Sequence, residues 1–93
     1  MPFGMPGEIA KSRHHLGLLE AARGDAGAAR EHFEAALDLR RKLLPEHPDT
    51  AHTLVRLGRL GEALTIFERR LGPGHPRTRA VREALAARGS DPA

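Results

Sequence analysis

Histidine is the residue type in this chain that most readily suggests chemistry, because six histidines occur among 93 residues. Imidazole is a common ligand for zinc and nickel. His14, His15 and His32 could meet if the segments on either side of Gly24 folded back as helices. A metal site needs three or four ligands at defined spacing, and neither His-x3-His nor His-Glu-x2-His occurs. We therefore predict no metal site and no cofactor, with metal binding by these three histidines as the lesser alternative.

Two other histidines directly precede prolines, in the pairs His47-Pro48 and His75-Pro76. Proline is favoured in the first turn of a helix, where the amide that it lacks would have no partner in the helix. The pairs predict that helices begin at Pro48 and Pro76. They also predict a capping or linker role for the two histidines.

Catalysis would require a nucleophile, a base or paired carboxylates on a rigid frame. Ser12, Ser90 and the four threonines lie in no recognisable nucleophile motif. Acidic residues such as Glu31 and Glu34 lie near arginines at helical spacing, which is typical of solvated ion pairs. We predict no catalytic residue and no enzyme activity.

Arginines crowd the C-terminal half, where residues 49–93 carry eight basic and five acidic groups and hold the whole excess of the +3 net charge. Guanidinium groups suit phosphates, so Arg77, Arg79 and Arg82 could bind nucleic acid. However, Phe67 is the one aromatic residue in this half, and no nucleic-acid motif is present. An arginine-mediated nucleic-acid accessory domain is therefore the alternative interpretation.

The elements that must hold these residues are predicted to be helices, because fifteen alanines accompany many leucines and arginines and no strand-like run occurs. Gly24 is predicted to end a first helix over 7–23. Asp25 is predicted to cap a second helix over 26–44. A short third helix, a fourth ending near Leu71 and a fifth over 76–88 follow, with one continuous helix over 49–71 as the alternative to the third and fourth.

Apolar residues recur near helical spacing in the first two predicted helices. The first helix carries Ile9, Leu16, Leu19 and Ala22, and the second carries Ala29, Phe33, Ala36, Leu37 and Leu44. We expect the second, more continuous stripe to anchor the core.

An internal repeat appears when the chain is offset by 34 residues, since six of the fourteen positions in 24–37 are identical to their counterparts. The repeated residues are Gly24, Gly27, Ala29, Phe33, Glu34 and Leu37, which match Gly58, Gly61, Ala63, Phe67, Glu68 and Leu71. Such a period indicates a helical repeat protein.

The repeated segments resemble the tetratricopeptide repeat family over residues 8–88. Leu16-Gly17 is similar to the Leu-Gly pair of the family's first helix, and Gly24 is similar to its turn glycine. Ala29, Phe33 and Ala36 resemble the small-large-small stripe of its second helix. The next unit repeats this pattern with Ala51, Gly58, Ala63 and Phe67. Arg70 departs from it, because a small residue belongs there. The linkers over 44–50 and 71–78 resemble the Leu-Gly-Pro-x-His-Pro linkers of kinesin-light-chain-like members, including bacterial ones.

The resemblance implies an all-α fold of antiparallel helical hairpins, a short α-solenoid of four or five helices. It places one domain over 1–93, with a first unit over 8–44, a truncated second unit over 48–71 and a terminal helix over 76–88. It implies a non-catalytic module for protein–protein interaction or scaffolding, with a protein or peptide partner. The concave face of such a module would be lined here by Lys11, His14, Leu18, Ala21, His52, Val55 and Arg56.

Self-association is also expected, because a repeat buries its apolar surface against neighbouring repeats and about three are usually needed. With two units, one of them truncated, we expect either a homo-oligomer formed through the first helix or the last two, or a piece of a larger repeat protein. The chain has no asparagine, which the well-known peptide grooves of the family use to grip a peptide backbone.

The cellular compartment is predicted from absences in the sequence. There is no cysteine, no apolar run long enough to span a membrane, and no signal-like pattern in residues 1–7. We therefore expect a cytoplasmic protein that does not act on membranes.

Overall fold

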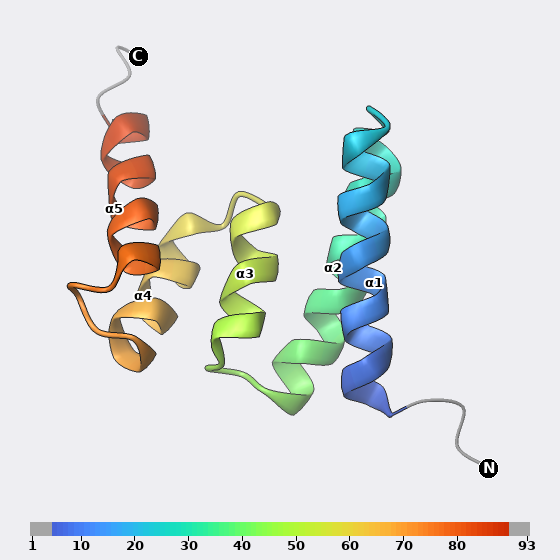
Figure 1. Cartoon of the computed structure of the whole chain (residues 1–93), viewed down its shortest axis with the longest axis horizontal. Helices are drawn as coiled ribbons and strands as arrows, with labels where there is room; N and C mark the ends of the chain where they lie inside the picture. Colours follow the sequence, from blue (N-terminus) through green and yellow to red (C-terminus); the bar gives the residue numbers. More distant parts are fainter. Residues whose placement is uncertain (1–4, 90–93) are drawn as a thin grey trace. The chain divides into compact units, whose positions relative to one another are not determined.

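The computed structural model describes residues 5–89, and these form five α-helices with no β-strand among them (Figure 1). The chain divides into two compact units, one ending at Pro45 and the other beginning at Glu46. The predicted all-α class, built from antiparallel helical hairpins, is confirmed. No helix within residues 5–89 has the length and apolar character needed to cross a membrane.

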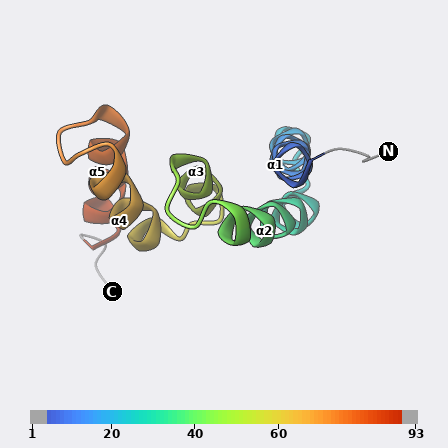
Figure 2. The same cartoon turned by 90° about the horizontal axis from the view of Figure 1, so that it is seen from below.

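The N-terminal unit is a hairpin of two long helices, α1 (Pro6–Ala22) and α2 (Ala26–Leu43). The two helices run antiparallel and lie side by side in both views (Figures 1 and 2). Phe33, Ala36 and Leu37 of α2 are buried, as expected for the anchor of the core.

The C-terminal unit consists of α3 (Pro48–Arg56), α4 (Leu60–Arg70) and α5 (Pro76–Gly89). α4 packs against both α3 and α5. Leu54 of α3 and Phe67 of α4 are each 1% exposed and form the centre of this core. The hairpin is short, because α3 and α4 have 9 and 11 residues where α1 and α2 have 17 and 18.

The 34-residue repeat is visible in the turns of the two hairpins. Gly24 and Gly58 both have positive φ, 88° and 78°, a conformation that glycine adopts without steric cost. The amide after each glycine donates to the carbonyl five residues earlier, over 2.9 Å in the first hairpin and 2.8 Å in the second. This closes the helix end in the same way in both hairpins. The turn at Gly58 separates α3 from α4, so the alternative of one continuous helix over 49–71 is wrong.

The predicted helix starts are confirmed in their hydrogen bonds. Oδ1 of Asp25 accepts from the amide of Ala28 over 3.0 Å. The ring Nδ1 of His47 and that of His75 each accept from the amide two residues ahead, over 3.0 and 3.1 Å. α3 and α5 both begin at the proline that follows. The two histidines therefore act as helix caps.

The face of α1 that packs on α2 is not the one that carries its large apolar residues. Ala10 and Gly17 are buried, whereas Ile9, Leu16 and Leu19 are 42%, 41% and 49% exposed. Because α1 meets α2 through small residues, the apolar periodicity of the sequence located this helix correctly but did not identify its buried side.

Candidate functional site

The centre of the N-terminal hairpin is the contact between Gly17 and Phe33. A Cβ atom on Gly17 would lie 2.6 Å from Cε1 of Phe33, far closer than side-chain carbons approach one another. The His14 ring packs tilted against Phe33, with 5.2 Å between ring centroids. The glycine of the Leu16-Gly17 pair is therefore needed because the phenylalanine ring occupies the space of its side chain.

The C-terminal unit repeats this arrangement of a phenylalanine beside a histidine. The His52 ring meets Phe67 edge to face, with 5.6 Å between centroids. Ala51 and Ala63, the small residues of the repeat, are fully buried. Nε2 of His52 lies 2.7 Å from Nη1 of Arg77, and this hydrogen bond links α3 to the start of α5.

The residues of α1 predicted to face a partner lie next to the side that packs on α2. His14 and Leu18 are half-buried, and Lys11 and Ala21 are exposed. At helical spacing these four residues share one side of α1.

The residues of α3 predicted to face a partner belong to the other unit. His52 and Val55 are half-buried and Arg56 is exposed, on the side of the helix away from the buried Leu54. His52 already contacts Phe67, so its ring is in part a structural element.

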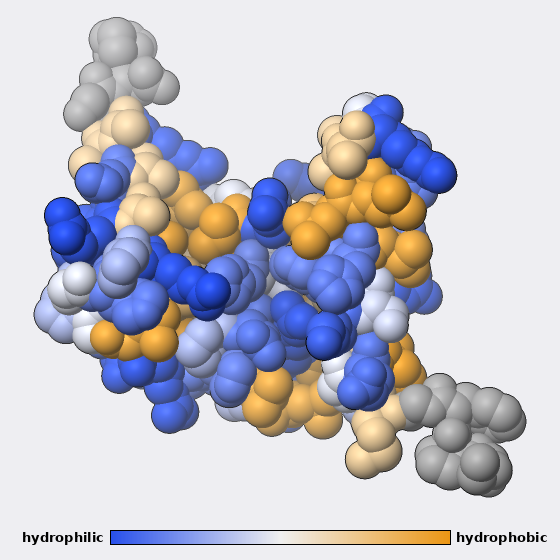
Figure 3. All heavy atoms as spheres, viewed as in Figure 1, coloured by the Kyte–Doolittle hydropathy of each residue, from blue (hydrophilic) through white to orange (hydrophobic). Residues whose placement is uncertain are grey.

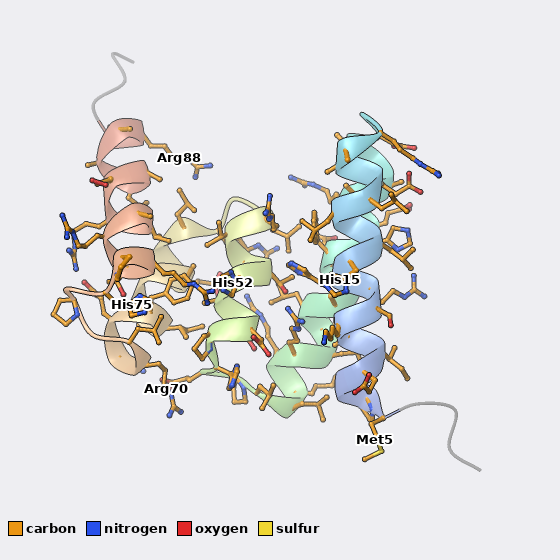
Figure 4. All side chains as sticks on the ribbon, viewed as in Figure 1. Met5, His15, His52, Arg70, His75 and Arg88 are labelled. Carbon is orange, nitrogen blue, oxygen red and sulfur yellow. The ribbon has the colours of Figure 1, made fainter. Side chains whose placement is uncertain are left out.

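Two of the three arginines predicted to bind nucleic acid, Arg77 and Arg82, make contacts within their own unit, as does Arg88 of the same helix. Besides Arg77, Arg82 donates to a carboxylate of α4 over 3.2 Å, and Arg88 donates to the carbonyl of Gly58 over 3.0 Å. Figure 4 shows the Arg88 side chain leaving α5 on the side of α3 and α4. Arg79 is exposed. These bonds fasten α5 onto the preceding hairpin, and a phosphate would have to compete with them.

Arg70, which departs from the repeat pattern, also has a structural role in this unit. Its Nε donates to the backbone carbonyl of Glu46 over 2.8 Å, while Nη1 of Arg69 reaches both carboxylate oxygens of Glu46 at 3.0 and 3.1 Å. α4 ends at Arg70, so this position lies in an exposed last turn where a long polar side chain fits.

The three histidines considered for metal binding are not arranged around one point. The ring centroids of His14 and His15 are 6.3 Å apart, and Nδ1 of His32 lies 3.3 Å from Nη1 of Arg13. Within residues 5–89, no three His, Cys, Asp or Glu side chains are grouped so that they could hold a metal ion.

The side of α1 away from α2 is an exposed apolar surface, whose residues the sequence placed on the first helix without showing which side they occupy. Ile9, Leu16 and Leu19 follow one another along the outside of the helix, with Ser12 between Ile9 and Leu16 and the N-cap residue Met5 just before the first turn. We call these five residues the outer α1 stripe. Figure 3 shows hydrophobic residues grouped over the upper part of α1. Figure 4 shows the Met5 side chain pointing away from the first turn of α1. The signal in the sequence is the regular spacing of four, three, four and three residues, which is typical of a helix that packs on another helix.

Large apolar side chains are exposed in the N-terminal unit alone among the residues that the structure describes. Beyond the outer α1 stripe they are Leu43 and Leu44, which are 44% and 38% exposed. The predicted core residue Leu44 is thus outside the core. In the C-terminal unit, Leu60, Ile66 and Val81 are buried.

Comparison with protein-family models gives a match to the tetratricopeptide repeat over residues 8–62. Comparisons with curated proteins and with solved structures give no significant match. The match covers nearly all of the N-terminal hairpin and the first helix of the next one, where the turn glycines and the small residues recur. The chain therefore belongs to the tetratricopeptide repeat family, whose members generally mediate protein–protein interaction.

Proposed function

We propose that this protein is a non-catalytic interaction module that binds a protein partner through the outer α1 stripe. The observation that carries the proposal is the exposure of Met5, Ile9, Leu16 and Leu19 on one side of a helix whose other side is packed on α2. A helix with apolar residues on both sides is normally covered on both. A contiguous exposed apolar patch on a folded domain typically marks an interaction site.

The first helix of each unit, α1 and α3, offers a second surface on the side that carries the residues predicted to face a partner. Lys11, Leu18 and Ala21 of α1 leave a mixed polar and apolar side accessible, as do Val55 and Arg56 of α3. We propose that each of these two sides, within its own unit, contacts a peptide, with His14 at the edge of the first side and His52 at the edge of the second. The outer α1 stripe remains the primary surface, because its side chains are larger and more exposed.

Nucleic-acid binding and catalysis have less support. Arg77, Arg82 and Arg88 are engaged with other parts of their own unit, and base-stacking aromatic residues do not accompany them. Acidic residues such as Glu46 and Glu68 pair with arginines in exposed positions, which is typical of surface ion pairs.

Site-specific photo-crosslinking in the cell that makes the protein tests the proposal. A benzoylphenylalanine at position 16 is expected to form adducts of defined mass with one protein, whether a second copy or another chain. The adducts should disappear when Ile9→Glu is added, because that charge lies in the same stripe. The matched control places the probe at position 43, which replaces a leucine of similar exposure. No adduct at position 16, or the same adducts at position 43, would contradict the proposal.

A further inference from the structure

We propose that the partner of the outer α1 stripe is the same stripe of a second copy of this chain, with the two α1 helices parallel and Ser12 at their centre. This inference rests on the proposed function, because it names the occupant of that surface. The N-terminal hairpins of the two copies, each made of α1 and α2, would form a four-helix arrangement in which each α1 is covered on both sides.

The distribution of exposed apolar residues favours a symmetric contact. A head-to-tail contact would have to seat the stripe on a different apolar surface, and among the described residues the other exposed large apolar side chains are only the adjacent pair Leu43 and Leu44, a smaller patch than the stripe. A two-fold contact needs one patch only, because both subunits use the same surface. The stripe supplies such a patch.

The spacing of the outer α1 stripe fits pairing between two helices. Intervals of four, three, four and three residues place Met5, Ser12 and Leu19 in one set of core positions and Ile9 and Leu16 in the alternate set. The stripe spans two heptads, too short for an isolated coiled coil, but α1 is already held as a helix by α2. Pairing therefore adds a contact and does not have to create the helix.

Charges beside the outer α1 stripe favour the parallel direction. In a parallel pair, the side chain just before Ile9 or Leu16 faces the side chain five residues further along the other helix. Glu8 would then face Arg13 of the second copy, and His15 would face Glu20 of the second copy. In an antiparallel pair, Glu8 would face His15 of the second copy, but the two Arg13 side chains would come together, so that two like charges meet. The parallel pair therefore has two attractive Glu8–Arg13 contacts where the antiparallel pair has a repulsion between two arginines.

Ser12 suits the centre of the contact because it is exposed and small. Small residues at a crossing point let two helix axes approach to about 8 Å. A single polar residue in an apolar seam also helps to fix the register, since its hydroxyl is best paired with its own counterpart.

Single cysteines test the geometry directly, because the chain has none of its own. Ser12→Cys is expected to oxidise to a disulfide-linked dimer, since residues at a two-fold axis come within the Cα separation of about 4.4–6.8 Å that a disulfide needs. Met5→Cys should link to itself, whereas Leu43→Cys, the control on α2, should stay monomeric. Disulfides between Met5→Cys and Leu19→Cys chains in place of Met5→Cys homodimers would overturn the parallel arrangement.

Charge reversal provides the second test. Glu8→Arg should raise the dimer dissociation constant about tenfold, because two attractive pairs become repulsive in each dimer. The double variant Glu8→Arg, Arg13→Glu should restore it to near the original value, with circular dichroism to show that each variant is folded. Failure of the double variant to recover would overturn the assigned pairing.

The two levels of the proposal can fail separately. A chain that stays monomeric while position 16 crosslinks to a different protein would overturn self-pairing and leave the interaction function in place. A chain that neither forms the Ser12→Cys disulfide nor gives adducts at position 16 would overturn both.

Discussion

At the scale of single residues, each hairpin depends on one phenylalanine that packs beside a histidine. Phe33 lies against Gly17 and beside His14, and Phe67 lies in the second hairpin beside His52. In both hairpins the histidine ring covers part of the phenylalanine ring. Aromatic pairs of this kind add a modest stabilisation beyond the area that they bury.

Gly17→Ala is expected to lower the free energy of unfolding by about 1–3 kcal/mol, because the new methyl group would overlap the Phe33 ring. Gly7→Ala is the matched control on the same helix, since no atom lies within 4 Å of the place that its methyl group would take. It should leave stability unchanged or raise it by up to about 1 kcal/mol, because alanine has the higher helix propensity. Urea unfolding followed by far-UV circular dichroism measures both. Equal effects of the two variants would show that the ring can move aside at little cost.

At the scale of helices, the second hairpin is a shortened copy of the first whose ends are secured by polar side chains. α4 stops at Arg70, and Arg69 and Arg70 bind the linker residue Glu46. α5 begins under the cap of His75 and is fastened near its end by Arg88. Side-chain hydrogen bonds replace part of the apolar contact that longer helices would provide.

Arg70→Ala is expected to destabilise the protein by about 0.5–1 kcal/mol, because the hydrogen bond to the Glu46 carbonyl is lost. The repeat pattern alone would favour the small residue, and alanine also has the higher helix propensity. Arg79→Ala makes the same change at an exposed position of α5 and serves as the control in the same urea unfolding measurement. A more stable Arg70→Ala variant would contradict the role assigned to this arginine.

His75→Ala should lower stability by about 1 kcal/mol, since the amide of Arg77 loses the side-chain acceptor that caps α5. His75→Asn should recover most of the loss, because the asparagine oxygen is a good cap acceptor. Thermal unfolding monitored by circular dichroism compares the three proteins. If His75→Asn is as unstable as His75→Ala, the contribution of the histidine comes from its ring packing and not from the cap.

At the scale of the whole molecule, the sequence predicts where the helices begin and end better than it predicts what they bury. Gly24, Gly58, Pro48 and Pro76 restrict the backbone locally, so the turns and helix starts could be found without knowledge of the tertiary structure. The buried side of α1 depends on close approach to α2, which Gly17 permits and hydrophobicity does not indicate.

The sequence is equally limited in showing which side chains of the candidate surfaces are accessible. Large apolar side chains are usually buried, so the stripe on the first helix suggests a core when the sequence is considered alone. The arginines of α5 suggest a phosphate-binding group because their internal partners, including the carbonyl of Gly58, lie far away in the sequence. Only the folded chain reveals that the apolar stripe is accessible and that several arginines are engaged.

The molar mass of the purified chain as a function of concentration tests the central claim most directly. Light scattering should give twice the 10.1 kDa of one chain at high micromolar concentration. Leu16→Glu should remain at the mass of one chain, and Leu43→Glu, which places the same charge at a leucine of similar exposure, should behave like the unaltered protein. A folded chain that keeps the mass of a single copy throughout, or a dimer that Leu16→Glu leaves intact, would contradict pairing through the outer α1 stripe.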